Sequence, residues 1–577
     1  MGTMTINKIR VTFTDEEENV LSVIRKAGFE MPTLCYRPEL LIHGSCRLCV
    51  VEDKHGRTFA SCSEKPRDGM EIYTNTPRLM RYRKMILELL LASHQRDCTV
   101  CIKSGECLLQ ATARRMGVNQ IRYETQQTNY PLDMSSPAIV LNPNKCILCG
   151  NCVRMCGDVQ GIGAVDFVDQ GPNYRVATVG GSKLADTDCV GCGQCRTFCP
   201  TGAITINTNI NAIREAIADP NVKVVAQIAP AVRVAVGHVF GFPNGVNVMG
   251  RIVNAMHRLG FDEVYDTAFG ADFTVMEESK ELLERLESGE NLPLFTSCCP
   301  AWVLDCEKRY PELTSHLSTC RSPMQMLGAV IREYYKDPKN NEGKRVLSVA
   351  VMPCTAKKGE ILRPESMTDG VQDIDYVLTT NELCTMIKKD GILFDRLEVE
   401  AVDMPFGISS GAGMIFGNSG GVTEAVLRRL NDGHERAKME QIKQSGVRGE
   451  EGIKEIVFHY HGKELRAAIV SGLANAAKLL KDIESGKATY HFVEVMACRR
   501  GCVMGGGQPL PAGDEERASR PKGLYEVDLT RQIKKSDENP LVLSLYDGLI
   551  RGKEHKLLHR NMAGRNNIGQ KEEKTTK

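Results

Sequence analysis

Cysteine is the residue type in this chain whose spacing points most directly to chemistry. The 577 residues include 23 cysteines, and most of them fall into short groups with the intervals of iron–sulfur ligands. Thiolates bind iron–sulfur clusters or zinc. The first residues carry no apolar leader, and no run is long enough to span a bilayer. We therefore expect metal ligands in a reducing cytoplasm rather than disulfides.

The first group has the spacing of a [2Fe–2S] site and consists of Cys35, Cys46, Cys49 and Cys62. A close pair of cysteines on a tight loop suits this cluster, and zinc is the alternative. An alternating strand at 4–12 and a short helix at 15–28 precede the group. We expect a small ferredoxin-like domain of the β-grasp type.

The second group combines one imidazole with three thiols: His94, Cys98, Cys101 and Cys107. It follows a leucine-rich stretch at 78–92 that has helical periodicity. This ligand set fits zinc as well as a [4Fe–4S] cluster. Its position between two iron–sulfur segments favours the cluster. A neutral imidazole in place of a thiolate makes the site less anionic, which should raise its reduction potential.

An internal repeat follows, with the ligand run of bacterial ferredoxins that hold two [4Fe–4S] clusters. In such runs the fourth cysteine binds the cluster of the other run. One predicted ligand set is therefore Cys146, Cys149, Cys152 and Cys199. The other predicted set is Cys189, Cys192, Cys195 and Cys156. Two runs at this spacing strongly indicate an electron-carrying domain.

Beyond about residue 210, short β runs alternate with amphipathic helices. Strands are predicted at 222–228, 263–265, 294–296, 346–352 and 490–496. Helices are predicted near 247–259, 272–287 and 472–483. This alternation predicts an α/β domain with mainly parallel sheets. The remaining cysteine motifs each follow a predicted strand, and the carboxyl ends of strands are where open α/β sheets hold ligands.

Four cysteines from three distant segments could hold one further [4Fe–4S] cluster: Cys299, Cys354, Cys498 and Cys502. The run Gly505-Gly506-Gly507 allows the backbone to approach closely. Lys357 and Glu360 lie near one ligand in the sequence, where a cation could stabilise anionic groups.

These motifs resemble the signatures of [FeFe]-hydrogenases. They read Thr-Ser-Cys-Cys-Pro-Ala-Trp, Met-Pro-Cys-Thr-Ala-Lys-Lys-Gly-Glu and Glu-Val-Met-Ala-Cys-Arg-Arg-Gly-Cys-Val-Met-Gly-Gly-Gly-Gln-Pro. The resemblance covers roughly residues 4–550, and the order of the N-terminal groups is similar to that of the monomeric clostridial type. It implies an H-cluster: a [4Fe–4S] cubane joined to a diiron subsite with carbonyl, cyanide and aza-dithiolate ligands.

The resemblance also implies roles for individual residues. Cys502 would bridge the cubane and the diiron subsite, and Cys299, Cys354 and Cys498 would complete the cubane. Lys357 would donate to a cyanide. The residues that would shape the pocket are Ala229, Pro230, Met352, Pro353, Glu360, Phe416 and Met496.

A proton relay is implied as well, through Cys298, Glu278, Ser318, Glu281 and Arg285. The two glutamates are three residues apart on a predicted helix and so share a face, with the arginine one turn further on. An exposed acidic helix face is the alternative for such a pair. Cys298 would exchange a proton with the bridging amine, whereas a small buried apolar residue is the alternative there. Cys306, Cys320 and Cys384 match no motif and are expected in the core.

Some positions depart from the family's motifs. Arg499 and Arg500 stand where Cys-Pro-Gly-Gly-Cys is usual, Ala231 replaces a serine, and Met324 replaces a glutamine. Fewer hydrogen bonds to the diiron ligands should change the potential and stability of the site.

The expected organisation is multidomain, α+β followed by α/β. The expected ranges are 1–78 for the [2Fe–2S] domain, 79–125 for the His-Cys₃ segment, 126–209 for the two-cluster domain, 210–551 for the H-cluster domain and 552–577 for a disordered tail.

The resemblance implies a hydrogenase that exchanges electrons with ferredoxin or flavodoxin and needs maturation proteins for the diiron subsite. The formal net charge of +1 gives no case for binding nucleic acid or a membrane. The alternatives are a slow uptake or sensory hydrogenase, a subunit of an electron-bifurcating complex and a non-catalytic iron–sulfur assembly relative. The assembly reading is disfavoured by the retained Cys298, Lys357 and relay. A respiratory complex I subunit would share only the first 210 residues.

Overall fold

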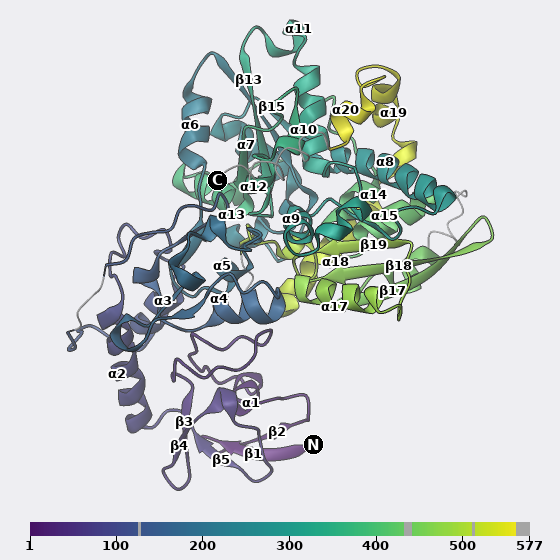
Figure 1. The fold of residues 1–577 in the computed structure, drawn as a ribbon. Helices are drawn as coiled ribbons and strands as arrows, with labels where there is room; N and C mark the ends of the chain where they lie inside the picture. The colour runs from purple at the N-terminus through teal and green to yellow at the C-terminus, as the bar shows by residue number, and fades with distance from the viewer. Residues whose placement is uncertain (125–128, 432–440, 450, 510–513, 561–577) are drawn as a thin grey trace, which may run out of the picture. The chain divides into compact units, whose positions relative to one another are not determined.

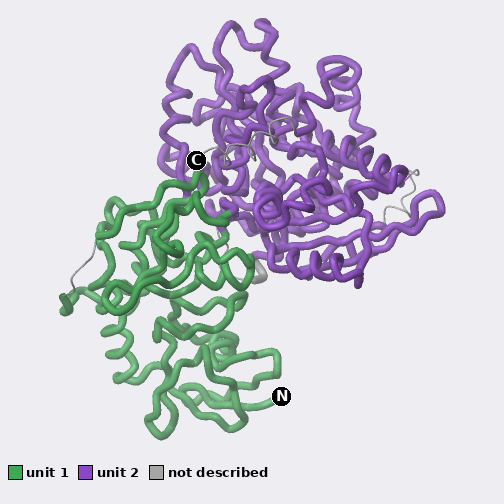
Figure 2. The backbone as a smooth tube through the Cα atoms, viewed as in Figure 1, with its two compact units in different colours: residues 1–189, 194–205 green, residues 190–193, 206–577 purple. Residues whose placement is uncertain are grey.

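The computed structural model describes residues 1–124, 129–431, 441–449, 451–509 and 514–560. The chain divides into two compact units (Figure 2). Unit 1 comprises Met1–Cys189 and Gln194–Thr205, and unit 2 comprises Val190–Gly193 and Ile206–Lys577. Within the described ranges, every helix is too short or too polar to cross a bilayer.

Unit 1 begins with a five-stranded sheet in the order β2-β1-β5-β3-β4. Its strands are β1 (Gly2–Ile6), β2 (Ile9–Phe13), β3 (Val50–Asp53), β4 (Thr58–Ala60) and β5 (Glu71–Tyr73). The single strand expected at 4–12 is wrong, because Asn7 and Lys8 adopt φ values of 50° and 71° and turn the chain into a hairpin. The expected helix at 15–28 is shorter, α1 (Val20–Lys26), because Asn19 accepts a hydrogen bond from Ser22 N and caps its start.

The rest of unit 1 consists of helices and two-stranded sheets around the cysteine loops (Figure 1). The helices are α2 (Pro77–Ser93), α3 (Leu108–Arg115), α4 (Asn151–Arg154) and α5 (Gln194–Phe198). Strands β6 (Ile139–Leu141) and β9 (Ile204–Ile206) form one sheet, and β7 (Asp166–Val168) and β8 (Arg175–Ala177) form another. Helix α2 agrees with the stretch expected at 78–92, and Thr76 caps it by accepting from Leu79 N.

Unit 2 contains a four-stranded, wholly parallel sheet in the order β11-β10-β13-β16. Its strands are β10 (Val222–Ile228), β11 (Glu263–Asp266), β13 (Arg345–Met352) and β16 (Tyr376–Thr379). Every residue of β10 is buried, as expected for a parallel strand whose two faces are both covered.

A second four-stranded sheet of unit 2 has the order β12-β19-β18-β17. Its strands are β12 (Leu294–Phe295), β17 (Ile453–Tyr460), β18 (Lys463–Ser471) and β19 (Phe492–Met496). Strands β12, β19 and β18 run parallel, and β17 closes the sheet as an antiparallel hairpin partner. Helix α17 lies along this sheet (Figure 1). The short strands β14 (Met367–Thr368) and β15 (Val371–Gln372) pair separately.

The helices of unit 2 pack around these sheets. Their bounds are α6 (Ile210–Ala218), α7 (Met249–Leu259), α8 (Thr267–Ser288), α9 (Pro300–Arg309), α10 (Pro323–Tyr334), α11 (Pro338–Asn341), α12 (Lys357–Glu360), α13 (Thr380–Lys389), α14 (Gly411–Met414), α15 (Gly421–Leu430), α17 (Leu473–Glu484), α18 (Asp514–Thr530), α19 (Pro540–Asp547) and α20 (Glu554–Leu558). Helices α7, α8 and α17 lie where helices were expected near 247–259, 272–287 and 472–483.

The expectation of a disordered tail from residue 552 is wrong for residues 552–560. Helix α20 forms there, and Leu557 and Leu558 are fully buried in an apolar cluster with residues of α8 and α10. Two buried leucines are enough to anchor a short segment whose other residues are polar. Residues 561–577 lie outside the described residues.

Candidate active site

A cavity of about 610 Å³ lies in unit 2 where strands of its two sheets end. The residues that line it are Ala229, Pro230, Ala231, Thr267, Ala271, Cys298, Cys299, Pro323, Met324, Met352, Pro353, Cys354, Lys357, Phe416, Gly417, Met496 and Cys502. Strand β10 leads to Ala229, β12 to the cysteine pair, β13 to Pro353 and β19 to the segment of the last two cysteines. The site therefore sits at the carboxyl ends of parallel strands.

The structure brings the four expected cubane ligands together. Cys299, Cys354 and Cys502 line the cavity, and Cys498 lies within electrostatic range of all three. Burial raises the pKa of the Cys354 thiol to about 11, and it raises the pKa of Cys299 as well. Buried thiolates therefore need a cation, and metal binding would release their protons. Four convergent thiols without a structural disulfide fit an iron–sulfur cubane.

The glycine run beside the last cysteine allows the close backbone approach that the sequence indicates. A Cβ atom at Gly505 would lie 2.2 Å from the carbonyl oxygen of Pro353, which is shorter than any real contact. Only glycine fits there, so Gly505 sets the packing of the Cys502 segment against the end of β13.

Lys357 provides the cationic group of the cavity. It is buried, its Nζ lies 2.7 Å from Glu360 Oε2, and it donates to Cys298 O over 3.3 Å. Burial alone would lower the pKa of Lys357, but the ion pair with Glu360 raises it above its ordinary value. Glu360 itself does not line this cavity. It lines a neighbouring polar cavity of about 330 Å³ and acts on the larger one through Lys357.

The five residues expected to relay protons lie one after another in space, from Cys298 at the cavity to Arg285 at the outer end. Glu278 is fully buried, and although neither carboxylate oxygen makes a hydrogen bond of good geometry, Ser318 and the backbone of Ser297 lie close enough to act on it. Burial raises its pKa to about 8, the charge of Glu281 acts in the same direction, and Ser318 acts in the opposite one. The pKa of Cys298 is raised by burial and next by the charge of Glu278. Both neighbours of Glu278 along the relay therefore lie within its electrostatic range.

The outer half of the relay is joined by hydrogen bonds. Ser318 Oγ donates to Glu281 Oε2 over 2.8 Å, and Arg285 Nη2 donates to Glu281 Oε1 over 2.5 Å. The backbone N–H of Thr319 also donates to this carboxylate, at 3.0 and 3.1 Å. The alternative of an exposed acidic helix face does not hold, since Glu278 and Glu281 are both buried.

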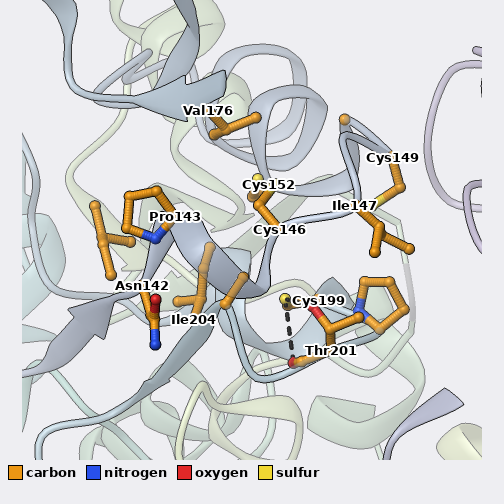
Figure 3. Close-up of a pocket in the computed structure, with 14 residues that line it drawn as sticks. Asn142, Pro143, Cys146, Ile147, Cys149, Cys152, Val176, Cys199, Thr201 and Ile204 are labelled. Atoms are coloured by element: carbon orange, nitrogen blue, oxygen red, sulfur yellow. Dashed lines mark hydrogen bonds between the residues drawn. The ribbon is translucent and has the colours of Figure 1, made fainter. Parts of the chain in front are cut away.

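The cysteine repeat of unit 1 encloses a cavity of about 490 Å³ (Figure 3). The cysteines that line it are Cys146, Cys149, Cys152 and Cys199. Burial raises the pKa of Cys146 to about 11, so this cavity too favours a metal over free thiolates. The structure thus brings together the first of the two predicted ferredoxin ligand sets.

Within unit 1, the structure also brings together the members of each of the two N-terminal groups. A hydrogen bond from Cys46 lowers the pKa of Cys35 to about 5, and one from Cys62 lowers the pKa of Cys49 to about 6. In the second group, burial and then the charges of neighbouring cysteines raise the pKa of Cys107.

The imidazole of His94, in the second group, is buried, whereas the cysteines of this group are more accessible. Burial and the nearby Lys145 lower the pKa of His94, which favours the neutral imidazole that a metal ligand requires. Cys98 is exposed and Cys101 is half-buried.

Sequence reasoning missed several residues at the site. Thr267, Ala271 and Gly417 line the cavity, but small residues on a helix or turn carry no sequence signal. Cys306, Cys320 and Cys384 are buried, as expected. The contacts of residues 558–560 near the relay were also missed.

Of the departures from the family motif, Ala231 and Met324 line the cavity, and both are buried. Arg500 adopts a φ of 64° at a position where the usual motif has glycine. A non-glycine residue in this left-handed region costs roughly 1–2 kcal/mol.

Replacing Arg500 by glycine is therefore expected to raise the midpoint of thermal unfolding, since it relieves about 1 kcal/mol of backbone strain. Circular dichroism of the purified chain measures this midpoint. Arg499→Gly is the matched control: Arg499 does not adopt a positive φ, so glycine there should lower the midpoint. An equal fall in both variants would contradict the strain assignment.

Comparison with known proteins supports the interpretation of this cavity as an active site. The family described as iron only hydrogenase large subunit, C-terminal domain, matches residues 222–506, and the iron hydrogenase small subunit family matches residues 514–561. Iron hydrogenase 1 of Clostridium pasteurianum is 36% identical over 97% of this chain and 99% of its own length. The chain belongs to the [FeFe]-hydrogenase family. It is an oxidoreductase that interconverts dihydrogen with protons and electrons.

Other relatives agree with this assignment. The NADP-reducing hydrogenase subunit HndD of Solidesulfovibrio fructosivorans is 40% identical over 97% of this chain and 98% of its own length. The structure of an apo [FeFe]-hydrogenase HydA1 variant from Chlamydomonas reinhardtii covers 61% of this chain with a TM-score of 0.53 and 35% identity.

The N-terminal parts match iron–sulfur families. The 2Fe-2S iron-sulfur cluster binding domain matches residues 3–77, the NADH-ubiquinone oxidoreductase-G iron-sulfur binding region matches 83–122, and the 4Fe-4S dicluster domain matches 145–203. This [FeFe]-hydrogenase therefore has iron–sulfur domains followed by a mixed α/β H-cluster domain.

Proposed function

We propose that the chain is a ferredoxin-coupled [FeFe]-hydrogenase whose H-cluster would be held by Cys299, Cys354, Cys498 and Cys502, with Cys502 as the ligand that would be shared with the diiron subsite. The observation that carries this proposal is the convergence of these cysteines, buried Lys357 and the relay on one cavity. When bound, the H-cluster supplies the iron centre at which protons and electrons combine.

The walls of the cavity would position that group and exclude water. The residues with this role are Ala229, Pro230, Met352, Pro353, Phe416 and Met496. Lys357 would donate a charge-assisted hydrogen bond to a cyanide, and Glu360 keeps its ammonium charged. A dry cavity strengthens such electrostatic contacts.

The chain itself would move the proton. The Cys298 thiol would give and take it at the cavity, and Glu278 would pass it on. Because the pKa of Glu278 is about 8, its carboxyl is protonated at neutral pH and can donate. Ser318 and Glu281 continue the path through their 2.8 Å hydrogen bond, and Arg285 holds the outer carboxylate.

We propose one [2Fe–2S] and three accessory [4Fe–4S] clusters, with the ligand sets and domain ranges expected from the sequence. The N-terminal five-stranded sheet with α1 supports the β-grasp assignment. The accessory clusters would carry electrons between ferredoxin or flavodoxin and the H-cluster, which maturation proteins would complete. The 23 cysteines, none of which forms a disulfide, support the proposal of a cytoplasmic location.

A second candidate concerns the electron partner. Because the relative from Solidesulfovibrio fructosivorans is a subunit of an NADP-reducing hydrogenase, this chain could instead oxidise dihydrogen and pass the electrons to partner subunits that reduce NADP⁺. Rates of dihydrogen oxidation with oxidised ferredoxin and with NADP⁺ as electron acceptors distinguish the two. Turnover of the purified chain with ferredoxin alone supports the first proposal, and NADP⁺ reduction that requires added partner subunits supports the second.

The active-centre proposal is tested by dihydrogen evolution from reduced methyl viologen together with an infrared spectrum of the same matured sample. Carbonyl and cyanide bands with turnover are expected. The same bands without turnover would indicate a sensory or blocked site and direct attention to Ala231 and Met324. No such bands after verified maturation would contradict the H-cluster assignment.

A further inference from the structure

The segment 318–321, which contains the relay serine, lies between two other chain segments of unit 2. On one side, Ser318 N donates to Phe295 O over 2.8 Å, and Leu317 and Phe295 form a parallel bridge. Phe295 ends strand β12, which leads directly to Cys298. One edge of the segment is therefore attached to the element that positions the inner end of the relay.

The other edge pairs with residues near the C-terminal end of the described chain. Cys320 and His559 form an antiparallel bridge, Arg321 N donates to Leu558 O over 2.8 Å, and Arg560 N donates to Thr319 O over 2.8 Å. These contacts pair the segment 558–560, which follows directly from the end of α20, with the relay segment through one isolated antiparallel bridge and its flanking hydrogen bonds.

Side chains strengthen this pairing. Arg560 Nη2 donates to the carbonyl oxygen of Ser318, and Arg321 Nε donates to His559 O over 2.8 Å. His559 Nδ1 lies 2.9 Å from Thr319 Oγ1, and its Nε2 lies 3.2 Å from Glu277 Oε2. Glu277 is on α8, the helix that also carries both relay glutamates, so His559 connects the relay segment to that helix.

The segment 558–560 is itself firmly held. Leu557 and Leu558 are at most 1% exposed, and Arg560 is 7% exposed. Tyr546 OH donates to Glu277 Oε1 over 2.5 Å, so the carboxylate that contacts His559 is itself held in place. A buried, hydrogen-bonded segment is a rigid support for a neighbouring backbone.

We propose that residues 558–560 form a C-terminal clamp that holds Ser318 at hydrogen-bond distance from Glu281, and that Arg560 and His559 are positioning residues for proton transfer. This inference rests on the proposed relay. Proton transfer requires donor and acceptor within about 2.6–3.2 Å, and a displacement of about 1 Å can cost roughly 100-fold in rate. Ser318 Oγ has this geometry because its backbone is fixed on both edges.

The test uses matured holoenzyme with Arg560→Met, and dihydrogen evolution is expressed per H-cluster counted by infrared spectroscopy. We expect turnover to fall roughly 10- to 100-fold, with unchanged infrared bands and a larger solvent deuterium isotope effect. Arg560→Lys, which retains a cationic donor, should recover part of the rate. A loss of stability alone would reduce the amount of loaded enzyme but would leave turnover per site and the isotope effect unchanged.

Lys556→Met is the matched control, because Lys556 lies on α20 but forms an exposed ion pair with Asp369 at 2.8 Å. Its turnover should equal that of the unmodified enzyme. If Arg560→Met yields no loaded enzyme, Arg560→Gln, which keeps a shorter amide donor, replaces it.

Ser318→Ala separates the two proposals. If Ser318→Ala slows turnover and the Arg560 variants do not, the clamp is wrong and the relay stands. If Ser318→Ala turns over at the full rate, the relay proposal itself is overturned, and the clamp with it.

Discussion

Replacing Glu278 by glutamine is expected to lower dihydrogen turnover about 100- to 10,000-fold, the range that positioned acid–base groups contribute. Glutamine keeps the size and neutrality of the protonated carboxyl but cannot pass a proton on. Glutamine also keeps a carbonyl oxygen that can face Ser318 and the backbone of Ser297, the two polar neighbours of the Glu278 carboxyl, so the local packing should be retained. Turnover with reduced methyl viologen measures the effect, and the infrared bands of the H-cluster should remain.

Glu284→Gln on the same helix is the matched control, because that side chain is exposed. It should leave turnover unchanged. A Glu278→Gln enzyme that keeps full activity would show that protons reach the cavity by another route.

The pKa of Glu278 also predicts a pH dependence. Its pKa is raised to about 8, so the carboxyl is protonated below that pH and loses its proton above it. Turnover in the direction of dihydrogen evolution should therefore fall as the pH rises through about 8, and this limb should vanish in Glu278→Gln. The free energy of unfolding should also fall as the pH rises. The unfolded state releases the proton of Glu278 above its ordinary pKa of 4.5, whereas the folded state keeps it up to about pH 8, so this group destabilises the fold progressively between these two values.

Replacing Arg428 by methionine is expected to lower the free energy of unfolding by about 3–5 kcal/mol, the cost of breaking a buried ion pair. Arg428 is 1% exposed and donates to Asp528 at 2.9 and 2.7 Å and to Glu424 at 2.6 Å. Its removal leaves two buried carboxylates close together. Denaturant unfolding followed by circular dichroism measures the loss.

Arg466→Met provides the comparison, because the Arg466–Glu464 pair is about half exposed and lies at 3.1 Å. Such a surface pair contributes about 0–1 kcal/mol. Equal losses in the two variants would argue against a special role for the buried network that joins α15 and α18.

Much of the α/β part could be predicted because its strands are short, mainly apolar runs rich in valine. Strand β10 has the expected ends, and β11, β13 and β19 differ by only one or two residues. The hairpin at Asn7 and Lys8 was missed because neither residue is the glycine that usually marks such a turn.

The residues of the candidate site likewise divide into those that the sequence predicts and those that it does not. Cysteine motifs and the spacing of Glu278 and Glu281 are local, so the sequence predicts them. The polar composition of residues 552–577 concealed the buried segment 557–560, because its burial depends on just Leu557 and Leu558 and on pairing with a segment more than two hundred residues away. Long-range pairing of this kind leaves no pattern in the sequence.

The distribution of the site along the chain has a consequence for biosynthesis. The cysteines of unit 1 all precede residue 200, so a ribosome can deliver them while most of unit 2 is still untranslated. The active-centre ligands are complete only once Cys502 has been made, and the relay segment gains its outer neighbour only with residues 558–560. With the proposed ligand sets, a nascent chain could thus acquire electron carriers well before it could complete the catalytic centre, and insertion of the diiron subsite would then follow translation.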